Sequence, residues 1–211
     1  MPKGIGAPAL LAVATLAVPP LKVAAAQSAT DLASQARQEC NQGQVTSDRE
    51  SRKAHYERGE ALAERAVAID DSSAAAHFGL VCNLGELLRL DGEKLTSVFA
   101  LRRLLSEIDK TLALDPSHVE AMATKGNLLL RLPRVLGGNA PEGERLLREV
   151  VRRDDTAVTS RIALARVCDE RGQRDEARSL ADQALVAAKQ KGRADKIAEA
   201  QAVVDQLGAE R

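Results

Sequence analysis

Residues 158–191 read VTSRIALARVCDERGQRDEARSLADQALVAAKQK, and this stretch of 34 residues decides the fold. Leu164 and Ala165 form a large-then-small pair in its first half, and Gly172 supplies a turn near the middle. The second half carries small residues at helical spacing, namely Ala177, Ala181 and Ala184. The pattern predicts two helices that are joined by a tight turn and packed closely through small side chains.

The same unit recurs along the chain with two insertions. Small and apolar residues followed by Asp stand at residues 66–71 (AVAIDD), 111–116 (TLALDP) and 150–155 (VVRRDD), and the small-plus-apolar pair returns at Ala184 and Leu185. The starts of these four segments are 45, 39 and 34 residues apart, which is a 34-residue period with 11, 5 and no residues added. This period, with two helices per unit, predicts an all-α, right-handed solenoid.

The last unit resembles a tetratricopeptide repeat position by position, notably at Leu164, Ala165 and Cys168. It departs from the family at two places, because Arg161 and Lys189 stand where an aromatic residue and a closing proline are usual. The resemblance implies an array of helix hairpins that binds other proteins.

A narrower resemblance rests on Asp115-Pro116, Pro133, Gly137-Gly138 and the insertion lengths, in a chain that looks exported. These features are similar to bacterial extracytoplasmic tetratricopeptide proteins related to the T component of tripartite periplasmic (TRAP) transporters, and to the regulator of microtubule dynamics family. This resemblance implies an array that docks a substrate-binding protein, with a ligand-accessible passage as a further expectation.

Hydrophobic spacing predicts where the helices of the middle units lie. First helices are expected at residues 73–90 and 118–131. The 11 extra residues should lengthen this hairpin instead of forming a loop, because apolar residues continue at helical spacing through them to Leu114. In the shorter insertion, Pro133 stops a helix. The residues that follow are Gly137 and Gly138, which allow positive φ, and Pro141, which suits a first helical turn.

The pattern is less regular at the N-terminal end. Residues 30–40 are predicted as a short helix and residues 41–46 as a polar linker. Ser47 and Glu50 have the spacing of a capping box that opens a long helix to Ile69. The first helix of this unit is therefore expected to be displaced or replaced.

The chain is accordingly divided into a signal peptide (1–26), a short helix and linker (27–47), a tetratricopeptide-like array (48–191) and a capping helix (192–211). A positive start, an apolar stretch and small residues before Gln27 predict cleavage after Ala26 and export, with the periplasm as the expected compartment. An uncleaved anchor is the alternative, although Pro8, Pro19 and Pro20 break a stretch too short to span a membrane.

The composition argues against several classes of function. Lys and Arg number 30 and Asp and Glu number 30, so no overall field attracts nucleic acid or anionic lipid. One Tyr, two Phe and no Trp leave no platform for stacking bases. Because phosphate-loop, nucleophile and zinc-helix motifs are missing, and Asp70-Asp71 and Asp154-Asp155 fit turns, no enzyme activity, cofactor or metal is expected.

Three cysteines leave at least one thiol unpaired. Cys82 and Cys168 fall within helical patterns and are expected to be buried, and their helices are too far apart for the ~7 Å Cα separation that a disulfide needs. Cys40, near the end of a short helix, is expected to be accessible and to cross-link two chains. The histidines, which lack partners at metal-ligand spacing, are His55, His77 and His118.

Function is expected on the concave face, which the first helices of tetratricopeptide arrays line. In this register the groove residues are Phe78, Cys82, Ala123, Asn127, Leu130, Ile162, Arg166 and Asp169. Phe78 and Cys82 occupy the Lys and Asn places of the family's carboxylate clamp, so that clamp is not carried over. Arg166 and Asn127 are expected to orient a polar group, while Phe78 and Leu130 give apolar contact.

The predicted function is therefore that of an exported interaction module or scaffold that docks another exported protein. One alternative is a transporter-associated component that binds or passes a ligand. A second is a self-assembling helical protein, and the oligomeric state is left open.

Overall fold

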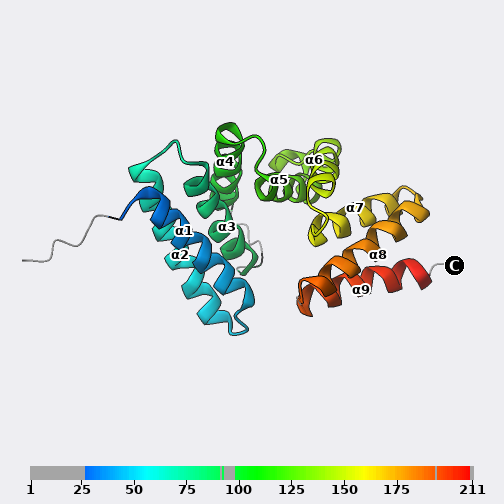
Figure 1. Ribbon diagram of the computed structural model, residues 1–211. Coiled ribbons are helices and arrows are strands. Elements are labelled where there is room, and N and C mark those ends of the chain that lie inside the picture. The colour runs from blue at the N-terminus through cyan, green and yellow to red at the C-terminus, as the bar shows by residue number, and fades with distance from the viewer. Residues whose placement is uncertain (1–26, 91, 93–97, 193, 210–211) are drawn as a thin grey trace, which may run out of the picture.

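The computed structural model describes residues 27–90, 92, 98–192 and 194–209, and every regular element in these ranges is a helix (Figure 1). The elements are α1 (Ala29–Val45), α2 (Arg49–Ile69), α3 (Ala74–Leu90), α4 (Val98–Leu114), α5 (Val119–Arg131), the 3-10 helix η2 (Arg134–Leu136), α6 (Ala140–Arg153), α7 (Val158–Glu170), α8 (Arg174–Gln190) and α9 (Ala194–Ala209).

Consecutive α-helices pack against each other as hairpins, in the pairs α1–α2, α3–α4, α5–α6 and α7–α8, and α9 packs on the last pair (Figure 1). The prediction of an all-α array of sequential hairpins with a C-terminal capping helix is thus confirmed. Within the described ranges, none of the helices combines the length and apolar character needed to cross a membrane. The predicted signal peptide, residues 1–26, lies outside the described residues.

The N-terminal end differs from the prediction of a short helix and a linker. Helix α1 runs unbroken to Val45, and its N-terminus is closed by a capping box between Ser28 and Asp31. Asp48, rather than Ser47, caps α2 by accepting a hydrogen bond of 2.8 Å from the Ser51 backbone N–H. Because α1 packs on both α2 and α3, it is the first helix of the first hairpin and has not been displaced.

The shorter insertion follows the predicted sequence of breakers. Helix α5 ends just before Pro133, and Pro141 lies in the first turn of α6. Gly137 has a φ of 95°, as expected, whereas Gly138 is needed for a different reason. A Cβ at Gly138 would lie 1.7 Å from the backbone oxygen of Leu132, so no side chain fits there. In the longer insertion, residues 93–97 lie outside the described residues, and α4 is helical from Val98.

The aspartates of the recurring signature build identical turns. One carboxylate oxygen, Oδ1, accepts both the backbone N–H and the hydroxyl of the residue two positions later. The pairs are Asp70 with Ser72 (3.0 and 2.6 Å), Asp115 with Ser117 (2.9 and 2.7 Å) and Asp154 with Thr156 (2.8 and 2.6 Å). These Asx turns explain why an aspartate recurs at the ends of α2, α4 and α6.

Replacing Ser72 by Ala is expected to raise the carboxyl pKa of Asp70 and to leave that of Asp115 unchanged. The Ser72 hydroxyl, followed by its backbone N–H, holds the pKa of Asp70 below its usual value, and Ser117 does the same for Asp115. A carboxylate with a lowered folded-state pKa contributes stability above its unfolded pKa, and the contribution is lost as the pH falls through the folded value. Carboxyl-carbon NMR titration measures both groups, and an unchanged Asp70 would contradict the turn assignment.

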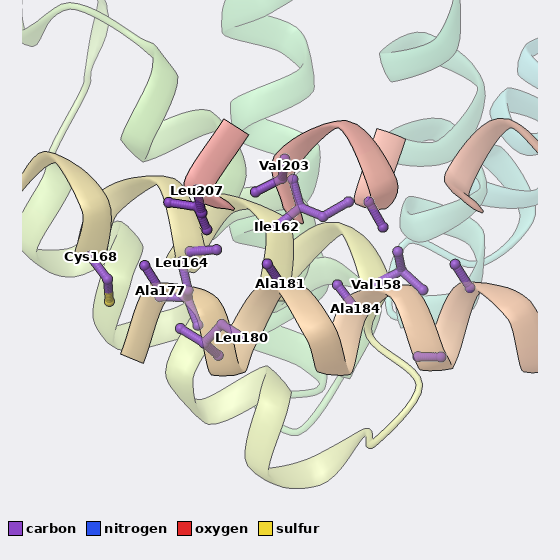
Figure 2. Packing of buried hydrophobic residues seen from close by; sticks show 14 of the residues in the cluster. Val158, Ile162, Leu164, Cys168, Ala177, Leu180, Ala181, Ala184, Val203 and Leu207 are labelled. Atoms are coloured by element: carbon purple, nitrogen blue, oxygen red, sulfur yellow. The ribbon is translucent and has the colours of Figure 1, made fainter. Parts of the chain in front are cut away.

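The last hairpin and α9 share one core, as Figure 2 shows. Leu164, predicted to be a core residue, is only 1% exposed, and Leu80 in the second hairpin is likewise buried. Val203 of α9 lies beside Ile162 of α7 in this view. The small residues Ala177, Ala181 and Ala184 of α8 are fully buried and let the helices approach closely, as predicted.

Helices α5 and α6 cross at a pair of glycines, where their backbones come into contact. A Cβ on Gly143 would lie 2.8 Å from the backbone oxygen of Gly126, and one on Gly126 would lie 2.6 Å from Cδ2 of Leu147. The helices therefore could not keep this separation with any larger residue at either position.

Replacing Gly143 by Ala is expected to lower the free energy of unfolding by about 1–3 kcal/mol, because the two helices must move apart. Gly85→Ala is the matched control. Gly85 also lies within a helix, but the atom nearest to an added Cβ, Cδ2 of Leu104, would be 3.9 Å from it. The control should raise stability by about 0.5–1 kcal/mol, since alanine is the better helix former. Urea unfolding compares them, and equal midpoints for the two variants would refute the close crossing.

Candidate protein-binding groove

First helices of neighbouring hairpins pack on each other in two places. Helix α1 packs on α3, α5 on α7 and α7 on α9, in addition to the contacts within each hairpin. Figure 1 shows the array bending so that its first and last hairpins approach the same side of α5.

The cysteine predictions require correction. Cys40 and Cys82 form a disulfide that joins α1 to α3, with 6.1 Å between their Cα atoms. Cys40 is fully buried, because α1 continues past it and packs on α3, so it is not on an accessible segment that could cross-link two chains. Cys168 is the buried free thiol, which agrees with the prediction that it does not pair with Cys82. Burial raises the pKa of this thiol.

Two of the predicted groove residues are buried, and a third is partly exposed but bonded within the chain. Phe78 is 5% exposed and Ile162 is 1% exposed, so both belong to the hydrophobic core. Cys82 is held in the disulfide. Phe78 and Ile162 therefore pack inside the array instead of contacting a partner.

The other five predicted residues lie on α5 and α7 and are at least partly accessible. They are Ala123, Asn127, Leu130, Arg166 and Asp169. The Asn127 amide donates a hydrogen bond of 2.8 Å to the Ala123 carbonyl within its own helix. The guanidinium of Arg166 is more than half exposed and lies 4.0 Å from the Glu199 carboxylate of α9.

A charged cluster that the sequence did not indicate covers Phe78. The Arg37 guanidinium lies 4.5 Å from the centre of the Phe78 ring, and the His118 ring packs on it at 4.3 Å between centroids. Glu120 is 3.7 Å from the Arg37 guanidinium and 3.3 Å from Nδ1 of His118. Burial lowers the pKa of Arg37 despite the Glu120 charge. Helices α1, α3 and α5 meet at these four residues.

His118 also caps α5, because its Nδ1 accepts a hydrogen bond of 3.3 Å from the backbone N–H of Ala121. A neutral imidazole with its proton on Nε2 makes this cap, whereas a protonated ring would donate from Nδ1 to Glu120 instead. His77 is buried between Glu107, at 2.6 Å, and the backbone oxygen of Asp71, at 3.0 Å. It is a satisfied core histidine, and no group of three or more metal-binding side chains occurs in the described ranges.

A hollow of about 330 Å³ lies next to Glu120 on the inner face. Its walls come from α1, α5, the end of α6 and the turn that follows it, the first turn of α7, Lys191 after α8 and the first turn of α9. Ala123 is a predicted groove residue that lines it. Its polar lining includes Gln44, Glu120, Asp154, Thr156, Thr159, Ser160, Lys191 and Lys196. The hollow therefore joins the two ends of the array across α5.

The fold and this inner face define an all-helical array of sequential hairpins, consistent with tetratricopeptide repeats. No protein-family model matches the chain, and no curated protein sequence matches it. Among solved structures, it is similar to one called "MamA RS-1 ArsTM double mutant", with 16% identity and a TM-score of 0.49. The match covers 85% of this chain and 96% of that one. A likeness this distant carries no information on function.

Proposed function

We propose that this protein is an exported interaction module that docks another exported protein along the inner face of its array. The observation that supports the proposal is the hollow of about 330 Å³, whose walls come from both the first and the last hairpin. A partner segment lying there would contact residues from distant parts of the chain at once. The exposed charge of Arg166 on α7 would extend this contact beyond the hollow.

Cross-linking from the groove itself identifies the partner and tests the location together. A photoreactive amino acid at Ala123, which lines the hollow, should capture one protein from an extract of the exported fraction. The same group at Ser106, exposed on the second helix α4, is the control and should capture none of it. Capture of the same protein from both positions would contradict the groove assignment.

The captured protein is then purified and its affinity is measured by calorimetry. The Arg166→Glu, Asn127→Ala double variant is expected to bind it roughly tenfold more weakly, because it reverses an exposed charge and removes an amide beside the hollow. Arg102→Glu is the matched control, since Arg102 is an exposed arginine on α4. Equal losses in both variants would indicate a general effect of charge and would contradict the proposal.

A second candidate function is the binding of a small ligand for a transporter. The volume of the hollow supports it, because 330 Å³ is close to the lower end of the range for ligand sites, about 300–1,000 Å³. Native mass spectrometry of protein purified from its own cells would show a bound small molecule if this function is correct. Sedimentation velocity in the same preparation would show whether the protein instead assembles with itself.

Export also remains a proposal, supported by the residue pattern of positions 1–26 and by the buried disulfide. Disulfides persist in oxidising compartments and are rare in the cytosol. N-terminal sequencing of the protein recovered from the periplasm should give Gln27 as the first residue. Recovery with Met1 intact would show a retained anchor instead.

A further inference from the structure

The position of His118 makes its hydrogen bonding depend on its protonation state. Its Nδ1 lies 3.3 Å from the backbone nitrogen of Ala121 and 3.3 Å from Oε2 of Glu120. The neutral ring accepts a hydrogen bond from the Ala121 N–H, and this contact caps α5. The protonated ring carries a hydrogen on Nδ1, so it can only donate, and Glu120 is an acceptor within reach. Nδ1 therefore serves either the cap or the carboxylate, but not both.

This ring lies where helices of the first three hairpins meet. It packs on Phe78 of α3, with 4.3 Å between the ring centroids. The Arg37 guanidinium of α1 lies 4.5 Å from the centre of the same Phe78 ring. Oε1 of Glu120, on α5, is 3.7 Å from Arg37. A change at His118 is therefore felt by α1, α3 and α5 together.

Protonation of His118 changes the charge balance of this cluster. With a neutral ring, Arg37 and Glu120 supply one positive and one negative charge. A protonated ring adds a second positive charge, so that a single carboxylate faces two cations. Burial already lowers the pKa of Arg37, which shows that its charge is poorly hydrated and sensitive to another cation nearby. The acidic form therefore loses the α5 cap and gains repulsion between α5 and α1.

The surroundings of the ring allow this change. In the described ranges, the charged groups around it are Arg37 of α1, Glu120 of α5 and Asp115 in the turn before α5. Oδ1 of Asp115 accepts two hydrogen bonds from Ser117 and is held in its own turn. The contact from α3, Phe78, is uncharged. The His118 side chain is 16% exposed, so the ring can exchange protons with solvent without unfolding.

We propose that His118 is a pH sensor that sets how firmly the first turn of α5 is held against α1. The neutral ring caps α5, whereas the protonated ring donates to Glu120 and leaves the first turn loose. Glu120 and Ala123 of α5 line the hollow, and Gln44 of α1 lines it too, so the change reaches the inner face. Histidine is the side chain whose ordinary pKa brings a change of charge between about pH 5 and 8. The sensor concerns the protein alone and does not depend on the docking proposal.

NMR spectra of the whole protein, recorded from about pH 8 to about pH 5, test the sensor. The Ala121 amide proton is expected to move upfield as its hydrogen bond is lost, with the same midpoint as the ring carbons of His118. The amide of Gln44, on the other helix, should move with that midpoint as well. If the Ala121 amide does not follow the His118 ring, or if Gln44 stays still, the proposal is overturned.

Two variants assign the response to His118. Asparagine is a strong N-cap residue that does not titrate, so His118→Asn should keep α5 capped and abolish the pH response of Ala121 and Gln44. His55→Asn is the matched control, because His55 is also a partly buried histidine beside a carboxylate, that of Glu39 at 2.7 Å. In this control the Ala121 amide should respond as in the wild type. A response of Ala121 that survives in His118→Asn, or that disappears in His55→Asn, overturns the proposal.

Discussion

Replacing Cys40 and Cys82 by Ala together is expected to lower the free energy of unfolding by about 4 kcal/mol. The disulfide closes a loop of 42 residues, and the chain-entropy account of cross-links gives about this value for such a loop. Cys40 is fully buried between α1 and α3, so the loss also loosens the packing of the first two hairpins. Urea unfolding monitored by circular dichroism measures the change.

A reducing agent should lower the stability of the wild-type protein and leave the double variant unchanged. Cys168→Ala is the control for loss of a buried sulfur, because Cys168 is buried but unbridged. It should cost clearly less than the double substitution. If the reductant does not move the unfolding midpoint of the wild type, the two cysteines are not bridged in solution.

Replacing Leu164 by Ala is expected to cost about 2–5 kcal/mol, because it leaves a cavity in a closely packed core. Leu164 is 1% exposed and lies in the cluster shared by α7, α8 and α9 (Figure 2). The neighbouring α8 side chains are mostly alanines, which cannot extend to fill the space. The large cost is therefore expected even though few large side chains surround the position.

Leu114→Ala is the matched control for this substitution. It makes the same chemical change at the last residue of α4, where the side chain is 37% exposed. Its effect should be within about 0.5 kcal/mol of zero if the exposed part of the side chain dominates. Comparable losses for Leu164→Ala and Leu114→Ala would show that the helices of the last unit are in a different phase.

The hairpin of α7 and α8 could be predicted almost completely from the sequence, because its unit contains no insertion and its apolar spacing is regular. The C-terminal end of α1 could not be predicted in this way. Asn41, Gln42 and Gln44 surround Gly43, and such a polar stretch with glycine is typical of a linker. In the structure Gly43 is buried under the Tyr56 ring, 2.3 Å from where its Cβ would be, so a tertiary contact requires this glycine inside a helix.

Only part of the candidate groove could be predicted, because the rest again depends on tertiary contacts. The predicted repeat register placed Phe78 on the inner face. That face would be open if no first helix preceded it. Because α1 is that helix, Arg37 covers Phe78 and Cys40 reaches Cys82. The hollow was missed because its walls are far apart in the chain. No local pattern relates Gln44 to Lys196, and only the bend of the array brings them together.

The covalent link between α1 and α3 also has a mechanical consequence. Tension applied between the chain ends cannot lengthen the segment between Cys40 and Cys82, which spans 42 residues. At roughly 3.3–3.6 Å per extended residue, about 140–150 Å of contour length stays hidden until the bond is reduced. The array therefore resists extension unequally: the segment from the end of α1 through α2 into α3 cannot lengthen, whereas the helices outside Cys40 and Cys82 can uncoil.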